Sequence, residues 1–159
     1  MKIISGGQTG ADRAALDAAI ACGVPHGGWC PKGRLAEDGP IADCYELQEM
    51  EDVDYPARTR ANVAAADLTL ILSNGPLTGG SLLTQQFAEE LGKPCVHIDL
   101  NENFQPLETV FAEGYGGQEN CACLCNRLEK MVLNVAGPRA SGDPRIYDAV
   151  YEQMLRLLS

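Results

Sequence analysis

Short runs of apolar, β-prone residues recur along this chain and predict buried strands. Four runs are too short to be helices, and they do not alternate strictly between apolar and polar positions, as is typical of strands covered on both faces. They lie at Lys2–Ser5, Leu68–Ser73, Cys95–Asp99 and Met131–Ala136. The pattern predicts a parallel sheet.

Between these runs, apolar residues repeat at helical spacing. Leu16 and Ile20 share one stripe in a helix expected at 11–22, and a second helix is expected at about 56–66. Leu83, Phe87 and Leu91 form the stripe of a helix at 81–91.

A closing helix is expected after Asp143, which would serve as its N-cap, with Pro144 as the first helical residue. Its stripe consists of Ile146, Val150, Met154 and Leu158. Strands that alternate with helices predict an α/β fold of Rossmann-like, three-layer α/β/α type with a mainly parallel sheet. The less regular stretch 25–54 is expected to form loops with one or two short strands.

Length and composition favour one small globular domain. The 159 residues suggest a single domain over 1–159, and the formal charge of −10 disfavours nucleic acid as a partner. No segment reaches the length of a membrane span and the N-terminus carries no signal pattern, so we expect a cytoplasmic protein without a membrane partner. The apolar helix faces could also form the interface of a homo-oligomer.

The seven cysteines are odd in number and scattered, which favours reduced thiols over a disulfide framework. Cys121, Cys123 and Cys125 form a C-x-C-x-C pattern that does not match the spacing of structural zinc sites. Buried small side chains are the simpler interpretation of this triplet, and we expect no metal site.

Ligands of open α/β sheets bind at the carboxyl ends of the strands, so the segment after each predicted strand is the place to look for function. The first such segment runs directly into a helix and consists of Gly6, Gly7, Gln8, Thr9, Gly10, Ala11 and Asp12. Glycine amides next to a helix N-terminus can hold a phosphate, and Thr9 and Asp12 have the spacing of a capping box. The alternative is a tight turn that needs glycine only for its dihedral angles.

Two further segments follow the same logic. Thr78, Gly79, Gly80 and Ser81 lie between a strand and a helix, and they form either a second phosphate loop or an ordinary capped loop. After the last predicted strand, Arg139 presents a planar fork that suits a phosphate or a carboxylate, although surface arginines are usually only solvated. The three loops meet at the same edge of the predicted sheet, which favours a shared binding site.

Other residues are candidates by residue type alone. Trp29, Lys32 and Arg34 could stack a flat base or pterin and pair with its phosphate, whereas the alternative for Trp29 is a core anchor. Glu37-Asp38-Gly39 could contact ribose hydroxyls or magnesium, but Asp-Gly is first of all a turn signal. His26 and His97 have no spaced partners and are expected to be structural.

Several motifs of the chain occur together, in this order, in a known family. They are Ser5–Asp12 (SGGQTGAD), Gly28–Arg34 (GWCPKGR), Glu37–Gly39 (EDG), Arg58-Thr59 with Asn62-Val63, Thr78–Ser81 (TGGS) and Leu133–Arg139 (LNVAGPR). The chain thereby resembles the putative molybdenum carrier family, in the circularly permuted YpsA-like branch of the SLOG superfamily. The resemblance covers almost the whole chain except residues 114–130. It implies a Rossmann-like fold and a nucleotide or molybdenum-cofactor-like ligand at the glycine loops.

Relatives in that superfamily include phosphoribohydrolases with a PGGxGTxxE signature. When Gly79 and Gly80 are aligned with its glycines, Leu82, Leu83 and Gln86 stand where its glycine, threonine and glutamate would be. Glu89 lies one turn further on. The resemblance therefore does not extend to the catalytic carboxylate.

Two functions follow as hypotheses. In the first, the chain is a carrier or sensor in which the amides of both glycine loops, with Arg58 and Arg139, hold a small phosphate-containing ligand. In the second, it is a nucleotide-processing hydrolase that cleaves an N-glycosidic bond, with Asp12, Glu37, Asp38 or Glu89 as acid or base.

Overall fold

The strand over Leu68–Ser73 (β7) is buried along its whole length, as its continuous apolar pattern predicts. It belongs to the central sheet of the computed structural model, which describes residues 1–102 and 130–159. The other strands of that sheet are β1 (Lys2–Ile4), β2 (His26–Gly27), β8 (Cys95–Asp99) and β9 (Val132–Ala136). They lie in the order β2-β1-β9-β7-β8, and every neighbouring pair is parallel.

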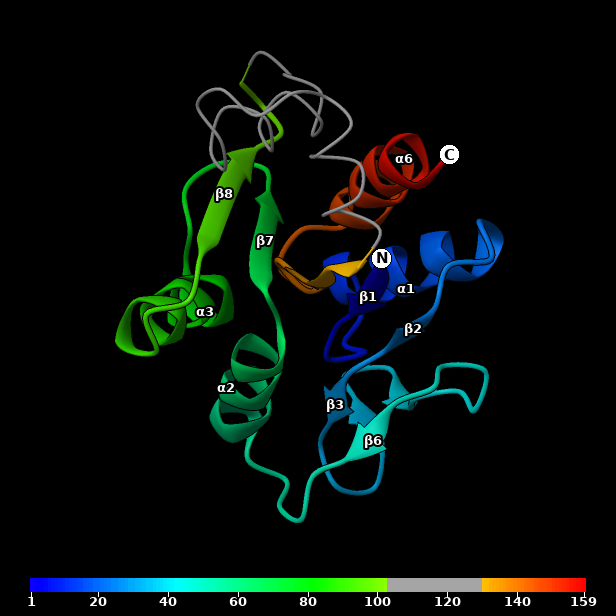
Figure 1. The fold of residues 1–159 in the computed structure, drawn as a ribbon, viewed down its shortest axis with the longest axis vertical. Helices are drawn as coiled ribbons and strands as arrows, with labels where there is room; N and C mark the ends of the chain where they lie inside the picture. Colours follow the sequence, from blue (N-terminus) through cyan, green and yellow to red (C-terminus); the bar gives the residue numbers. More distant parts are fainter. Residues whose placement is uncertain (103–129) are drawn as a thin grey trace.

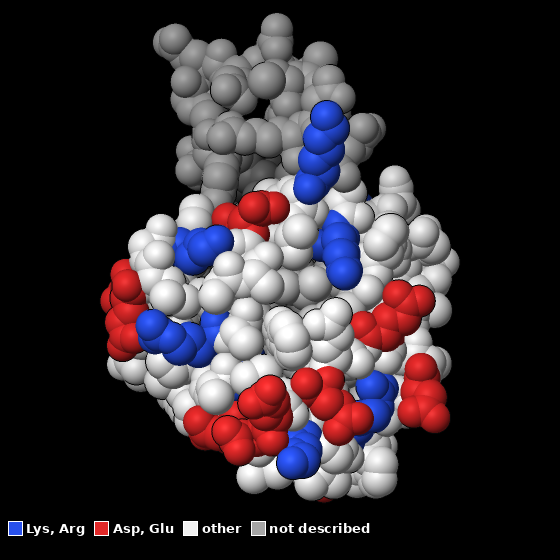
Figure 2. All heavy atoms as spheres, turned by 60° about the horizontal axis from the view of Figure 1, so that its bottom comes forward, with Lys and Arg blue, Asp and Glu red and all other residues white. Residues whose placement is uncertain are grey.

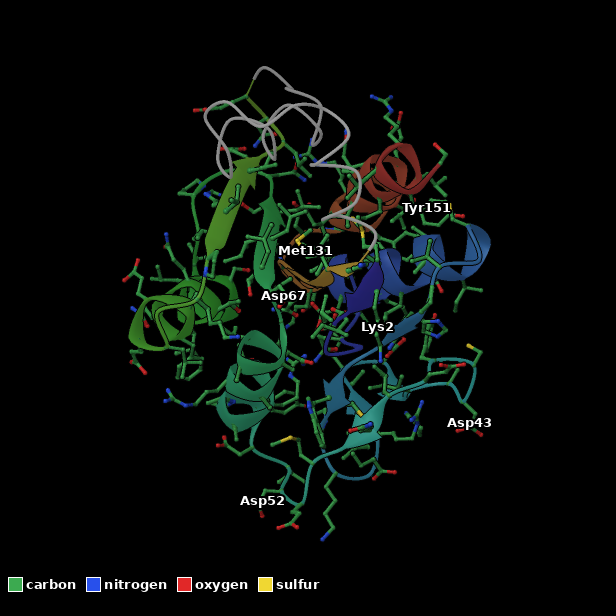
Figure 3. The ribbon with its side chains drawn as sticks, viewed as in Figure 1. Lys2, Asp43, Asp52, Asp67, Met131 and Tyr151 are labelled. Atoms are coloured by element: carbon green, nitrogen blue, oxygen red, sulfur yellow. The ribbon has the colours of Figure 1, made fainter. Side chains whose placement is uncertain are left out.

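Hydrogen bonds at the start of β9 set its register between β1 and β7. Lys2 N donates to Met131 O at 2.9 Å on one side. On the other side, the Asp67 carboxylate accepts from Val132 N at 2.8 Å, and Asp67 N donates to Val132 O at 2.9 Å. Lys2, Asp67 and Met131 are labelled in Figure 3 near the middle of the molecule. Chain segments far apart in sequence are thus joined at the centre of the sheet.

Two helices pack together on one side of the sheet, α1 (Ala11–Ala21) and α6 (Ile146–Leu158) (Figure 1). The buried face of α1 is made mainly of alanines, and Ile146, Val150 and Met154 of α6 are fully buried in the same core. The predicted stripe of α1 is wrong at Ile20, which is 42% exposed, because the small alanine face packs on the sheet and on α6 instead.

The second pair of helices is α2 (Tyr55–Ala65) and α3 (Gly79–Glu90), which contact each other. The Leu83, Phe87 and Leu91 stripe predicted for α3 is only half-buried. Its buried residues are Ser81, Thr84 and Ala88, one position further round the helix. The three-layer, Rossmann-like arrangement with a parallel sheet is confirmed.

The predicted caps of two helices are wrong. The N-cap of α1 is Gly10 without a side-chain hydrogen bond, because the Thr9 hydroxyl is bound by Glu37 instead of closing a capping box. Helix α6 begins at Ile146, two residues after Pro144. Asp143 forms a turn before it, accepting from Arg145 N at 3.0 Å.

The stretch between β2 and α2 contains more short strands than the one or two expected. Parallel β3 (Trp29–Cys30) and β6 (Gln48–Glu49) pair, and β4 (Leu35–Ala36) and β5 (Gly39–Pro40) form an antiparallel hairpin. A small second core holds this stretch against α1 through Leu16, Cys30, Ile41, Tyr45 and Leu47. Among the helices of the described residues, none combines the length and apolar character that a bilayer crossing requires.

Candidate functional site

A polar cavity of about 360 Å³ opens at the carboxyl ends of β1, β9 and β7. Strand order reverses here, because the chain runs outward from β1 to β2 on one side and from β7 to β8 on the other. Open α/β sheets bind ligands at such a switch point. The cavity is lined by Gly6, Gln8, Asp12, Arg58, Thr59, Asn62, Thr78, Gly79, Gly80, Ser81, Thr84, Asn134, Val135, Ala136, Gly137, Pro138, Arg139, Ser141 and Gly142.

An ion pair joins two walls of the cavity. Arg58 Nη1 of α2 lies 3.0 Å from Asp12 Oδ2 of α1, and the side chains are only 13% and 9% exposed. Asp12 Oδ2 also accepts from Gln8 N at 3.4 Å. Burial raises the pKa of the Asp12 carboxyl above its ordinary value, and the charge and hydrogen bonds of Arg58 oppose that rise. Arg58 therefore offsets part of the penalty that burial imposes on the charged form of Asp12.

Arg58 has hydrogen-bonding capacity left over. Its Nε is buried and finds no acceptor within residues 1–102 and 130–159. A buried donor without a partner costs about 1–3 kcal/mol, more when it carries charge. Arg58 also lines the cavity, so an anionic group placed there would lie next to its positive charge.

The N-terminus of α3 forms another wall. Its N-cap Thr78 makes no side-chain capping bond, and a side chain added at Gly79 or Gly80 would meet no atom within 4 Å. The first turn of a helix presents unpaired amides and a partial positive charge. This end of α3 is consequently open to a ligand in the cavity.

The first glycine loop is engaged mainly with the protein itself. Thr9 N donates to Gln8 Oε1 at 3.0 Å, and Ala11 N donates to Pro138 O at 3.1 Å. A side chain at Gly10, whose φ is +78°, would come within 2.8 Å of Ala140 N. The glycine at this position therefore lets the loop after β9 pack against the start of α1.

Glu37 holds three loops together from the β4–β5 turn. Its carboxylate accepts from the Thr9 hydroxyl, from Ser141 N at 3.0 Å and from Ser141 Oγ at 2.5 Å, and it lies 3.9 Å from Arg139 Nη1. These hydrogen bonds, that from the Ser141 side chain foremost, lower the pKa of Glu37. The sequence singled out Glu37 but carried no signal of its contact with Ser141, 104 positions away.

Not all residues singled out in the sequence reach the cavity. It brings together Gly6, Gln8, Asp12, Arg58, Thr78–Ser81 and Arg139. Gly7, Thr9, Gly10, Trp29, Lys32 and Arg34 do not line it. Asn62, Thr84 and Asn134 line it without having been proposed as ligand contacts.

The residues outside the cavity organise the loops around it. The guanidinium of Arg34 donates to four main-chain carbonyls, those of Ile41, Ala42, Tyr45 and Leu47, at 2.8–3.2 Å. Gly7 has φ +74°, and a side chain there would approach Leu47 Cδ1 to 2.6 Å. Lys32 N donates to Asp52 O at 3.1 Å.

Trp29 is clamped through its main chain. Its N–H donates to Asn62 Oδ1 at 2.8 Å and its carbonyl accepts from Asn62 Nδ2 at 2.9 Å. Gly28, with φ +120°, lets this segment approach the end of β1, since a side chain there would come within 2.8 Å of Ser5 N. The only tryptophan is thus fixed beside the cavity by a residue that also lines it.

The fold and the cavity define a Rossmann-like α/β protein with a polar site at the switch point of its sheet. The model of the circularly permutated YpsA SLOG family matches residues 3–158, and the chain belongs to that family. A crystal structure of a "Putative molybdenum carrier protein" from Syntrophus aciditrophicus SB is similar at 49% sequence identity and a TM-score of 0.86. The similarity covers 99% of this chain and 94% of that one. No curated protein matches.

Proposed function

We propose that this chain is a carrier or sensor that binds a small phosphate-bearing ligand, nucleotide-derived or molybdenum-cofactor-like, in the cavity at the switch point. The family and the crystal structure of a similar protein named as a molybdenum carrier support a binding role. The cavity volume of about 360 Å³ suits a small ligand, since such sites measure about 300–1,000 Å³.

Arg58 is the observation that carries the proposal. Arg58 lines the cavity together with the uncapped N-terminus of α3, and its buried Nε has no acceptor among the described residues. Arginine with a helix N-terminus is a combination that suits phosphate, because both offer N–H donors and positive charge. The phosphate would therefore lie between Arg58 and the amides of Gly79 and Gly80, with Arg139 at the exposed side of the cavity. The amide of Ser81 already donates to Thr78 O at 3.1 Å, so Ser81 would contribute its hydroxyl.

For a molybdenum-bearing ligand, the described residues fit the organic phosphate better than the metal. In the described part of the chain, no three His, Cys, Asp or Glu side chains gather closely enough to hold a metal ion. Cys121, Cys123 and Cys125 lie outside the described residues. Recognition through phosphate is thus the part of the proposal that these residues support.

The first experiment is mass spectrometry of small molecules released from the purified protein, with metal content measured on the same sample. A nucleotide or pterin near stoichiometric amounts is expected. An empty protein that also binds neither ADP nor inorganic phosphate in titration calorimetry contradicts the proposal.

A pair of arginine variants tests the location. Arg58→Met should weaken ADP binding by about tenfold or more, since a charge-assisted hydrogen bond is lost. The matched control is Arg60→Met on the same helix, which removes an exposed pair with Glu90 at 2.8 Å outside the cavity. Equal affinity in the two variants, with both folded by circular dichroism, contradicts the assignment of Arg58.

The alternative function, N-glycosidic hydrolysis, has one supporting observation. Of the four candidate carboxylates, Asp12 lines the cavity, whereas Glu37 is bound by Ser141 and Asp38 pairs with Arg13. Glu89 is exposed near the end of α3. Release of base from nucleoside monophosphates that is lost in Asp12→Asn would favour an enzyme, and no turnover across a nucleotide panel counts against one.

The surface charge of the protein indicates which kind of partner fits this proposal. Figure 2 shows acidic and basic side chains intermingled on one face of the molecule, without a broad basic field of the kind that nucleic acids prefer. With a net charge of −10, we propose a small-molecule partner and a cytoplasmic location. An electrophoretic shift with duplex DNA or RNA at physiological salt would contradict the first point.

A further inference from the structure

The acidic side chain of Asp12 lies in the wall of a cavity that is proposed to bind an anion. Asp12 lines the cavity, is 6% exposed, and lies next to Arg58, the residue that would hold the phosphate. An anion without a proton is repelled by a neighbouring carboxylate, whereas an anion that carries a proton can donate it in a hydrogen bond. The same pair of residues therefore attracts one kind of anion and disfavours another.

Asp12 retains acceptor capacity for such a bond. The hydrogen bonds from Gln8 N and Arg58 Nη1 both end on Oδ2. An ionised carboxylate can accept about four hydrogen bonds in all. The other charged side chains lining the cavity in the described residues are Arg58 and Arg139, and arginine does not titrate near neutral pH.

We propose that Asp12 makes the cavity selective for anions that carry a proton, such as hydrogen phosphate and the singly protonated form of a phosphomonoester, over sulfate and molybdate. This inference rests on the proposed function and names its ligand class more closely. Sulfate and molybdate carry no proton at neutral pH, while a phosphomonoester loses its last proton with a pKa of about 6. Free molybdate would then be a poor ligand of the cavity.

The electrostatics of Asp12 agree with this role. Burial raises the pKa of its carboxyl, so it is a better proton acceptor than an exposed aspartate. A site built to accept a hydrogen bond rejects analogues that lack the donor, because its own polar group is then left unpaired. Asp12 therefore acts as a specificity-determining residue within the phosphate site.

The test compares inorganic phosphate, sulfate and molybdate in titration calorimetry at about pH 7 and constant ionic strength. The wild type should bind phosphate about tenfold or more tightly than sulfate and molybdate, as expected for one charge-assisted hydrogen bond. In Asp12→Asn this preference should largely disappear, since an amide can donate to any oxyanion. The control Asp43→Asn removes the same charge at a fully exposed position on a distant loop (Figure 3) and should keep the preference.

A second measurement uses only the wild type, so it tests the inference even if Asp12→Asn fails to fold. Methyl phosphate loses its last proton near pH 6, whereas inorganic phosphate still carries one above that pH. The affinity for methyl phosphate, relative to inorganic phosphate, should fall between about pH 5.5 and 7.5. Equal binding of the three oxyanions, tighter binding of molybdate, or no such fall overturns the inference and leaves the proposed function standing. If the protein binds none of these anions, the inference and the proposed function are both contradicted.

Discussion

The guanidinium of Arg58 lies directly against the main chain of Gly6. A methyl group added at Gly6 would overlap Arg58 Nη1 and come within 2.9 Å of Asp12 Oδ2. Glycine at position 6 is therefore required by Arg58 of α2, which uses this space to reach Asp12. The first glycine of the loop after β1 thus serves the ion pair in the cavity wall.

Gly6→Ala should displace Arg58 while leaving the fold intact. The overlapping group is the far end of a flexible side chain, so it can move, but it then loses its place beside Asp12. We expect phosphate affinity to fall by about tenfold or more, because a charge-assisted contact is lost. Titration calorimetry with inorganic phosphate measures the effect.

Gly23→Ala is the control for this variant. Gly23 ends α1 with φ +66°, and an added side chain meets nothing within 4 Å. This change should cost about 1–2 kcal/mol of stability through backbone strain and should leave phosphate affinity unchanged. If phosphate affinity is also unchanged in Gly6→Ala, Arg58 is not part of the phosphate site.

Glu37→Gln should make the protein less dependent on pH at the acid end. The pKa of Glu37 lies below its ordinary value of 4.5 in the folded state, so its contribution is present above pH 4.5 and is lost as the pH falls through the lowered value. The free energy of unfolding of the variant should lie below that of the wild type near pH 7 and approach it in acid. Urea denaturation at several pH values checks this. A difference that grows in acid would contradict it.

Asn62→Ala should destabilise the segment that carries Trp29. Asn62 is 3% exposed and satisfies both the N–H and the carbonyl of Trp29. Loss of two buried hydrogen bonds should cost about 2–3 kcal/mol of unfolding free energy. Because Trp29 is the only tryptophan, its fluorescence should report a more exposed ring. The exposed Asn101→Ala should change neither signal.

Arg34→Lys should lower stability without affecting phosphate affinity. An ammonium group cannot reproduce the planar fork that reaches the carbonyls of Ile41, Ala42, Tyr45 and Leu47. We expect a loss of about 1–3 kcal/mol in chemical denaturation.

The same variant tests the sequence-based role of Arg34. If phosphate affinity falls in a variant that is still folded, Arg34 contacts the ligand, as the sequence predicted. Lys32→Ala, which removes an exposed cation in the same loop, serves as its control.

Several features of the fold could be predicted from local patterns. The bounds of β7 and β8 match the predicted runs, because a continuous apolar run between turn residues has few other solutions in a chain of this size. The stripe of α6 also matches at Ile146, Val150 and Met154. The prediction failed for Ile20 of α1, since alanine contributes little to an apolar pattern yet allows the closest approach to a neighbouring helix.

Glycine pairs followed by a helix were enough to single out the loops after β1 and β7 from the sequence. The tertiary structure separated their roles, because the loop after β1 is occupied by contacts with Pro138 and Asp12, whereas the N-terminus of α3 stays uncapped. A glycine can serve a turn, a close approach or a ligand, and the sequence pattern is the same for all three.

The sequence alone determined the class of fold, four strands of the central sheet and the loops where a ligand could bind, because these depend on periodicity and on short-range turn chemistry. Only the tertiary structure decided that Arg58 and Asp12 share a cavity wall, that Glu37 ties Thr9 to Ser141, and that Arg34 holds a loop. These contacts join residues from 7 to 104 positions apart. Their geometry is set by how helices and loops pack on the sheet, which no local pattern encodes.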